Sequence, residues 1–178
     1  MLTQIFEQSL NQFFQRESQN ILSGVSERNL CSRLAIPLER LAHQNGLTNY
    51  YADTEYNRKQ NGMVKTMLGE DMKTINITCD LILHSRGEVM PRDNLIAIEM
   101  KKSERSEEEK NNDRARLCTL TKTSFDDVWS FDGKTYPEHV CGYEVGYFIE
   151  LDKNKHYYKV QQFQSGELVS EFNGQFGL

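Results

Sequence analysis

The sequence predicts an α/β fold in which a mixed sheet of four to five strands is flanked by helices. Two N-terminal segments carry apolar residues at helical spacing, residues 74–103 hold two apolar-rich runs joined by a polar loop, and two alternating runs follow. The 178 residues are 38% hydrophobic and 26% charged. These values suit a single domain spanning residues 1–178, with its core at about residues 24–163.

Residues 1–22 contain the first predicted helix, which is amphipathic and runs from residue 3 to about residue 20. Its apolar residues recur at helical spacing, and they are Ile5, Phe6, Leu10, Phe13 and Phe14. Two interpretations stay open. The apolar face packs on the rest of the domain, or it covers a second chain, as in a homodimer or a subunit of a larger complex.

The second predicted helix begins after a serine cap, Ser23 or Ser26, and ends near Gly46. Its apolar stripe consists of Leu30, Leu34, Leu38 and Leu41. Pro37 lacks an N–H group and crowds the preceding turn, so we expect a kink or a restart there. Glu27 extends the stripe, where a carboxylate is unusual unless it meets a cation. The alternative is a first-turn glutamate favoured by the helix dipole.

Residues 74–103 predict an antiparallel hairpin, preceded by an edge strand at residues 49–58 and a connection or flap at residues 59–73. If Arg86 opposes Asp93 across the loop, one face holds the apolar pairs Leu83–Ile96, Leu81–Ile98 and Cys79–Met100. The other face then holds the pairs Ile82–Ala97, Asp80–Glu99 and Thr78–Lys101. A slip by one residue would set apolar side chains against charged ones, which supports this register.

Asp80 and Glu99 are therefore expected to oppose each other, about 5 Å apart at Cβ, with Lys101 beside them. Like charges directly opposite one another destabilise a sheet, so a structural role explains the pair poorly. A hard divalent cation reverses the sign of this interaction, because carboxylate oxygens are the ligands that Mg²⁺ and Mn²⁺ prefer. Solvated charges on an exposed sheet face are the alternative interpretation.

An aspartate in one strand and Glu99-Met100-Lys101 in the next resemble the PD-(D/E)XK nuclease superfamily, whose fold is the restriction-endonuclease-like core. Cys79 stands where the name-giving proline would be, a position that varies in the superfamily. The resemblance covers roughly residues 24–151. It implies hydrolysis of phosphodiester bonds in nucleic acid, with DNA as the expected substrate, and leaves endonuclease or exonuclease action open.

The resemblance also implies roles for individual residues. Asp80, Glu99 and Lys101 would be the catalytic residues. Asp80, Glu99 and the backbone carbonyl of Met100 would hold one or two Mg²⁺ or Mn²⁺ ions, and Lys101 would orient a water molecule or help to deprotonate it. Glu27 would be a further metal ligand, since the first core helix of superfamily members often supplies a glutamate.

A second group of candidates follows from two further runs. E-Y-N-R at residues 55–58 and D-L-I-L-H-S-R-G at residues 80–87 resemble small bacterial members of the superfamily. This resemblance indicates Glu55, His84 and Arg86 as additional site residues.

The segment after the hairpin predicts one more helix and the remaining strands. Ser106 and Glu109 form a capping box that opens a helix to about residue 122. Asp113, Arg116 and Leu117 lie on the part of this helix expected to approach the site, and Arg116 joins the second group of candidates. A solvated charged helix face is the alternative interpretation of these residues. A loop with aromatic anchors, including Trp129, precedes strands at residues 143–151 and 156–163 and one short final strand.

The net charge and the distribution of the cysteines limit which partners and which cellular location are expected. A net charge of −5 does not favour nucleic-acid binding, but the acids are clumped, and a local basic groove could include Arg28, Arg58, Lys59 and Lys102. Scattered cysteines, no visible secretion signal and no apolar run of membrane-spanning length predict a cytoplasmic protein without a membrane partner. The alternative function is a catalytically silent nuclease-like module for nucleic-acid binding or protein assembly.

Overall fold

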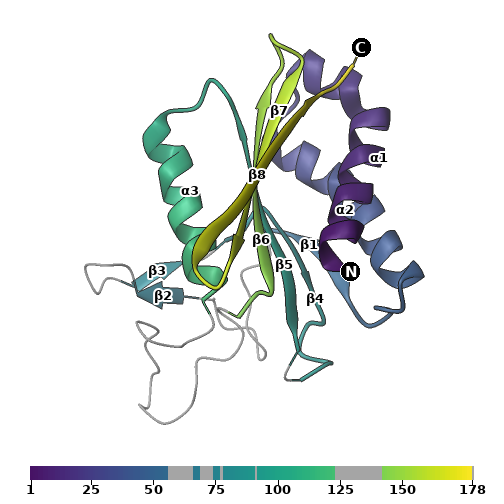
Figure 1. Cartoon of the computed structure of the whole chain (residues 1–178), viewed down its shortest axis with the longest axis vertical. Helices are drawn as coiled ribbons and strands as arrows, with labels where there is room; N and C mark the ends of the chain where they lie inside the picture. The colour runs from purple at the N-terminus through teal and green to yellow at the C-terminus, as the bar shows by residue number, and fades with distance from the viewer. Residues whose placement is uncertain (56–65, 69–73, 77, 91, 123–141, 178) are drawn as a thin grey trace.

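The computed structural model describes residues 1–55, 66–68, 74–76, 78–90, 92–122 and 142–177 (Figure 1). Within these ranges the chain forms α-helices α1 (Leu2–Ser23), α2 (Glu27–Gln44) and α3 (Glu107–Leu120). The strands are β1 (Tyr51–Thr54), β2 (Thr66–Leu68), β3 (Thr74–Asn76), β4 (Leu81–His84), β5 (Asn94–Lys102), β6 (Val145–Asp152), β7 (Tyr157–Gln164) and β8 (Glu167–Gln175).

The main sheet is mixed and has the strand order β1-β4-β5-β6-β7-β8, while β2 pairs only with β3 among the described strands. β5 and β6 run parallel, and the other neighbours in the main sheet are antiparallel. The α/β class and the flanking helices are as predicted, but the main sheet has six strands rather than four to five. The additional strand is β8, which has nine residues and pairs along its length with β7 instead of forming one short piece.

The helices cover opposite faces of the main sheet (Figure 1). On one face, side chains of α1 and α2 form one core cluster with alternate residues of the strands, among them Leu81, Leu83, Ile96 and Ile98. On the other face, α3 forms a second cluster with Ile82, Ala97, Phe148 and Phe163. Because successive side chains of a strand point to opposite faces, Glu99 shares the face of Ala97 and points toward α3.

The apolar face of α1 packs on its own domain, which is the first of the two interpretations. The Phe6 ring stacks on Tyr147 with centroids 3.5 Å apart, and the Phe14 ring stacks on Tyr158 at 4.2 Å. Apolar residues of α1 from Leu2 to Ile21 belong to the larger core cluster. The core therefore begins well before residue 24, and no apolar stripe of α1 is left over to cover a second chain.

Local sequence signals set the N-terminal ends of the other two helices. The Ser26 side chain accepts a hydrogen bond from the Asn29 amide at the start of α2, and Ser106 and Glu109 form the expected capping box of α3. α2 continues through Pro37 without a break, so the expected restart is wrong. The leucines on either side of Pro37, Leu34 and Leu38, are fully buried, and this packing holds the helix together despite its missing N–H donor.

The hairpin has the predicted register over three pairs: Leu81 with Ile98, Ile82 with Ala97 and Leu83 with Ile96. A bulge then shifts His84 to face Asn94. The prediction that the strand also includes residues 74–80 is wrong, because residues 74–76 pair with β2 and Asp80 lies in a bend. The expected ladder pairs of Cys79, Asp80 and Thr78 with β5 are therefore absent from the described sheet.

Replacing Phe6 by alanine is expected to lower the free energy of unfolding by about 3–5 kcal/mol, because the ring is fully buried against Tyr147. Urea denaturation followed by circular dichroism measures the change. Gln8→Ala, at an exposed position of the same helix, is the control and should stay within about 0.5 kcal/mol of wild type. Equal stability of the two variants would contradict the packing role of α1.

Candidate metal centre

β5 extends beyond the start of β4, and carboxylates take the place of the missing strand. Asp80 Oδ2 accepts a hydrogen bond from the Met100 amide at 2.9 Å, and Glu27 Oε1 accepts one from the Lys102 amide at 2.9 Å. The N–H and C=O groups of one residue in an extended strand point to the same side. The Met100 carbonyl is therefore directed toward the side on which Asp80 lies.

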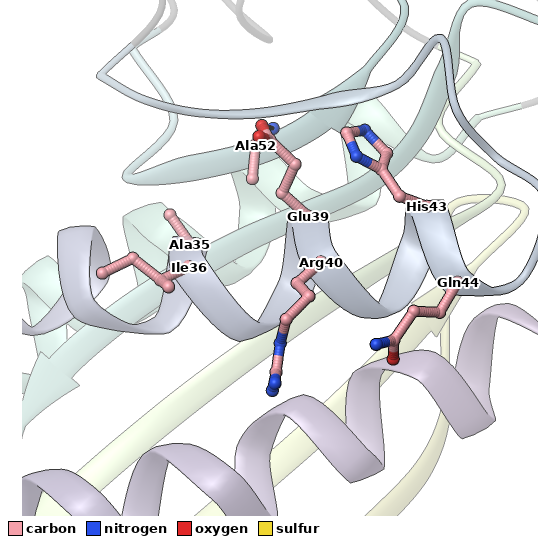
Figure 2. Close-up of a pocket in the computed structure, with 7 residues that line it drawn as sticks. All are labelled: Ala35, Ile36, Glu39, Arg40, His43, Gln44 and Ala52. Atoms are coloured by element: carbon pink, nitrogen blue, oxygen red, sulfur yellow. Dashed lines mark hydrogen bonds between the residues drawn. The ribbon is translucent and has the colours of Figure 1, made fainter.

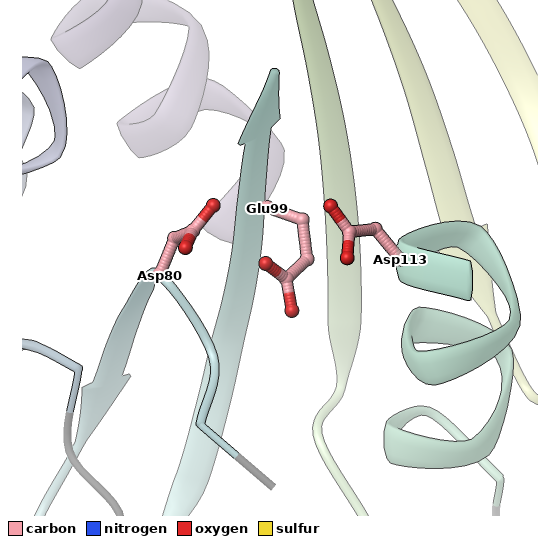
Figure 3. A group of neighbouring side chains, drawn as sticks. All are labelled: Asp80, Glu99 and Asp113. Atoms are coloured by element: carbon pink, nitrogen blue, oxygen red, sulfur yellow. The ribbon is translucent and has the colours of Figure 1, made fainter. Parts of the chain in front are cut away.

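Three carboxylates meet at this point (Figure 3). Asp80 comes from the bend before β4, Glu99 from the middle of β5 and Asp113 from α3, and one oxygen of each lies within 4.8 Å of the others. Two opposed oxygens of a Mg²⁺ ion are about 4.2 Å apart. Only one of the three oxygen pairs can be opposed, and adjacent oxygens of the ion are about 3 Å apart. Side-chain movements of about 1–2 Å would therefore bring all three oxygens into one coordination sphere.

Two cationic side chains contact the carboxylates. Lys101 Nζ lies 2.9 Å from Asp113 Oδ2 and 3.8 Å from Asp80 Oδ2. Arg116 Nη1 lies 2.5 Å from Glu99 Oε1 and 3.1 Å from Asp113 Oδ1. When all five side chains are ionised, the three carboxylates and the two cationic groups leave one uncompensated negative charge. Among the described residues, the fully buried Glu99 Oε2 has no hydrogen-bond partner.

The buried surroundings shift the pKa values of this group. Burial raises the pKa of Glu99 well above its ordinary value, and the charge of Asp80 adds to the shift while Arg116 opposes it. Burial likewise raises the pKa of Asp80. Burial alone would lower the pKa of Lys101, but the charges of Asp80 and Asp113 outweigh it and raise the pKa. Lys101 is therefore an ammonium group at neutral pH in this arrangement.

Asp113 was not proposed as a ligand from the sequence, although its helix was expected near the site. The signal was present, because Lys110, Asp113, Leu117 and Leu120 recur at helical spacing and form the buried face of α3. What the sequence did not reveal is that this face meets β5 opposite Glu99.

Glu27 lies outside the group of three carboxylates and does not fit the role of a metal ligand here. Besides the Lys102 amide, its carboxylate accepts hydrogen bonds from Arg105, with Nε–Oε1 at 3.2 Å and Nη2–Oε2 at 3.3 Å. Its oxygens are thus engaged by the extended end of β5 and by the turn that follows. Glu27 fixes the strand that carries Glu99 and Lys101.

Glu55 also acts on the site indirectly. Its side chain forms a two-point ion pair with Arg28, with both hydrogen bonds at 2.5 Å, and its amide donates to the Asp80 carbonyl at 3.2 Å. Glu55 has a positive φ of 51°, a conformation that is uncommon outside glycine. The ion pair holds the chain in this conformation and so positions the backbone of Asp80.

His84 and Arg86 belong to a separate polar cluster with Asp53, a residue that the sequence analysis did not single out. Asp53 Oδ2 accepts hydrogen bonds from His84 Nε2 at 2.9 Å and from Arg86 Nε at 2.7 Å. The Arg86 guanidinium also lies 4.3 Å from the Tyr51 ring centroid. His84 lies four positions along the chain from Asp80, about 13 Å in an extended strand, so this cluster lies on the same sheet face as the carboxylates but is centred on a different part of it.

The described residues do not assemble the expected basic groove. Arg28 is paired with Glu55, and Lys102 Nζ donates to the Gly24 carbonyl at 3.0 Å. The other two candidates, Arg58 and Lys59, lie outside the described residues.

A hollow on the outer surface of α2 is lined by Ala35, Ile36, Glu39, Arg40, His43, Gln44 and Ala52 (Figure 2). Two of its polar side chains form hydrogen bonds with the backbone of β1 and of the residue before it. Glu39 accepts a hydrogen bond from the Ala52 amide at 2.8 Å, and His43 Nε2 donates to the Tyr50 carbonyl at 2.8 Å. These contacts cover the outer edge of β1, and the hollow lies on the face of the sheet opposite to the metal centre.

Comparisons with protein-family models, curated proteins and solved structures found no match to this chain. None of the described helices is both long enough and apolar enough to cross a membrane. Three of the four cysteines, Cys31, Cys79 and Cys118, are free thiols, while Cys141 lies outside the described residues.

Asp53→Asn is expected to destabilise the protein by about 1–3 kcal/mol at pH 7, because hydrogen bonds from His84 and Arg86 outweigh burial and lower the pKa of Asp53. A lowered folded-state pKa contributes stability above the unfolded value, about 3.9, that is lost as the pH falls through the folded value. The difference from wild type, measured by urea denaturation, should therefore shrink below about pH 4. Glu88→Gln, at an exposed loop position, is the control. A difference that is independent of pH would contradict the ionic role of Asp53.

Proposed function

We propose that this protein is a divalent-metal-dependent nuclease of the PD-(D/E)XK type that hydrolyses phosphodiester bonds in nucleic acid, with DNA as the expected substrate. One observation carries the proposal: the carboxylates of Asp80, Glu99 and Asp113 converge around a fully buried Glu99 oxygen that has no hydrogen-bond partner among the described residues. The mixed sheet between helices supports a restriction-endonuclease-like core for the same chain.

The donor set fits a hard cation. Asp80, Glu99 and Asp113 offer carboxylate oxygens, and the Met100 carbonyl is directed to the same side, which suits Mg²⁺ or Mn²⁺ rather than a metal that prefers sulfur or imidazole. When bound, such an ion supplies Lewis-acid stabilisation of the phosphate and lowers the pKa of a coordinated water molecule. It also supplies the positive charge that the buried acids lack.

Lys101 contributes a positioned ammonium group. In the metal-free protein the charges of Asp80 and Asp113 outweigh burial and raise its pKa, so Lys101 is there a hydrogen-bond donor that a water molecule or the phosphate can accept from. The Asp113 carboxylate, 2.9 Å away, holds the ammonium in place. The resemblance implies two roles for Lys101, orientation of a water molecule or help in its deprotonation, and both belong to the proposal.

One observation favours the alternative of a silent module. Lys101 and Arg116 already neutralise most of the carboxylate charge, so the cluster could serve as a buried ion-pair network that stabilises one packing of α3 on the sheet. Such a network needs no metal. The two functions therefore differ first in cation binding and then in cleavage.

Mn²⁺ is expected to raise the thermal unfolding temperature of the wild-type protein, because it binds only the folded carboxylate group. At a Mn²⁺ concentration one hundred times its Kd, the stabilisation is about 2.7 kcal/mol. The shift should disappear in Asp80→Asn and persist in Asp152→Asn, whose aspartate organises the turn after β6. Equal shifts in Asp80→Asn and wild type would remove Asp80 from the cation site.

With Mg²⁺ or Mn²⁺, the wild-type protein is expected to cleave at least one member of a panel of labelled duplex, single-stranded and branched DNA and RNA. Lys101→Ala should reduce the rate on the order of 100-fold or more, because the phosphate loses a charged donor. Lys155→Ala, at an exposed turn position, is the control and should cleave at the wild-type rate. Cation binding without cleavage of any substrate would favour the silent module.

A further inference from the structure

Arg116 brings a positive charge to two of the three carboxylates that a metal ion would use. Its Nη1 atom contacts both Glu99 and Asp113, while Lys101 contacts the second oxygen of Asp113. Both Asp113 oxygens and one Glu99 oxygen are thus matched by cations of the chain itself. Arg116 occupies the position of a counter-ion within the metal centre.

The Arg116 side chain is partly exposed, whereas the helix that carries it is anchored in the core. α3 is anchored through Leu117 and Leu120, which are almost completely buried, whereas the Arg116 side chain is 23% exposed. Burial alone would lower its pKa, but the charge of Glu99 outweighs burial and keeps the guanidinium charged. The charged group can therefore move by rotation of its own side chain while the helix stays in place.

Arg116 Nη1 would share the Glu99 and Asp113 carboxylates, though not necessarily the same oxygens, with any divalent cation bound by Asp80, Glu99 and Asp113. Two cations at such a short distance repel each other strongly in a buried site. The guanidinium must then leave Glu99 and find another anion, or the cation binds weakly. A phosphate group is well suited to receive it, because a planar guanidinium matches two phosphate oxygens at once.

We propose that Arg116 is an internal counter-ion that couples substrate phosphate to the divalent cation: it holds Glu99 and Asp113 in the metal-free protein and transfers to a phosphate of the nucleic acid when the cation takes Glu99. This proposal rests on the metal centre of the proposed function. Under this proposal the cation and the phosphate favour each other's binding. The phosphate draws Arg116 away from the carboxylates that the cation needs, and the cation releases Arg116 from Glu99 so that it can bind the phosphate. Arg116 thereby favours loading of the metal in the presence of a phosphate ligand.

The test measures Mn²⁺ affinity by calorimetry, with and without deoxythymidine 5′-monophosphate, in wild type, Arg116→Gln and the matched control Arg114→Gln. Arg114 lies on the same helix but contacts Asn111, Gln161 and the carboxylates of Glu107 and Glu150. In wild type and Arg114→Gln, the nucleotide should lower the Kd for Mn²⁺ at least about fivefold. Arg116→Gln should bind Mn²⁺ alone at least about fivefold more tightly, with little further effect of the nucleotide.

Unchanged Mn²⁺ affinity in a folded Arg116→Gln variant, or full coupling to the nucleotide, would overturn the counter-ion role while leaving the metal centre intact. Absence of Mn²⁺ binding in wild type would instead overturn the proposed function. A second measurement, NMR of the wild-type protein, does not depend on whether the variant folds. The Arg116 Nε–H NMR resonance should shift when Mg²⁺ and the nucleotide are added together, and the Arg114 resonance should not; an unmoved Arg116 resonance with both bound would also overturn the role.

Discussion

Burial of the Glu99 carboxylate is the constraint around which this part of the molecule is built. A charged group removed completely from water is costly unless it meets charges or hydrogen bonds, and here the second carboxylate oxygen has no hydrogen-bond partner within the described residues. The surrounding chain supplies Arg116 from α3 and Lys101 from the same strand, but it also adds Asp80 and Asp113. The three acids and two cations leave one negative charge unmatched when all are ionised, which is the basis of the proposed cation site.

The sheet provides this arrangement through unequal strand lengths. β5 has nine residues and β4 only four, so the end of β5 lacks a neighbour on one side. Asp80 and Glu27 accept the amide hydrogens left there, which satisfies the backbone and brings one carboxylate beside Glu99. A longer β4 would have paired these amides with backbone carbonyls, and the Asp80 side chain would have lost this anchor.

The fold was largely accessible from the sequence, whereas the site was accessible only in part. Alternation in the hairpin predicted three strand pairs correctly, and it placed Glu99 and Lys101 on the face opposite the larger core. Asp80 was identified, but as a member of a continuous strand rather than of a bend. Glu27 and Glu55 were candidates for direct roles, yet their carboxylates are occupied by Arg105, Arg28 and the Lys102 amide. Partners of this kind depend on which elements pack together, and a single sequence does not reveal that.

By itself, the sequence determined the α/β class, the two apolar faces of the sheet and the start of α3. The spacing of apolar residues, the pairing of a hairpin and the capping of a helix all depend on residues that are near one another in the sequence. The sequence already placed Arg116 among the candidates, but only the tertiary structure decided that Asp113 joins Asp80 and Glu99 as a third carboxylate, and that Glu27 supports β5. These contacts join residues up to 75 positions apart. They form only where α3 and α2 settle against the strands, since the packing of buried side chains fixes the position of each helix.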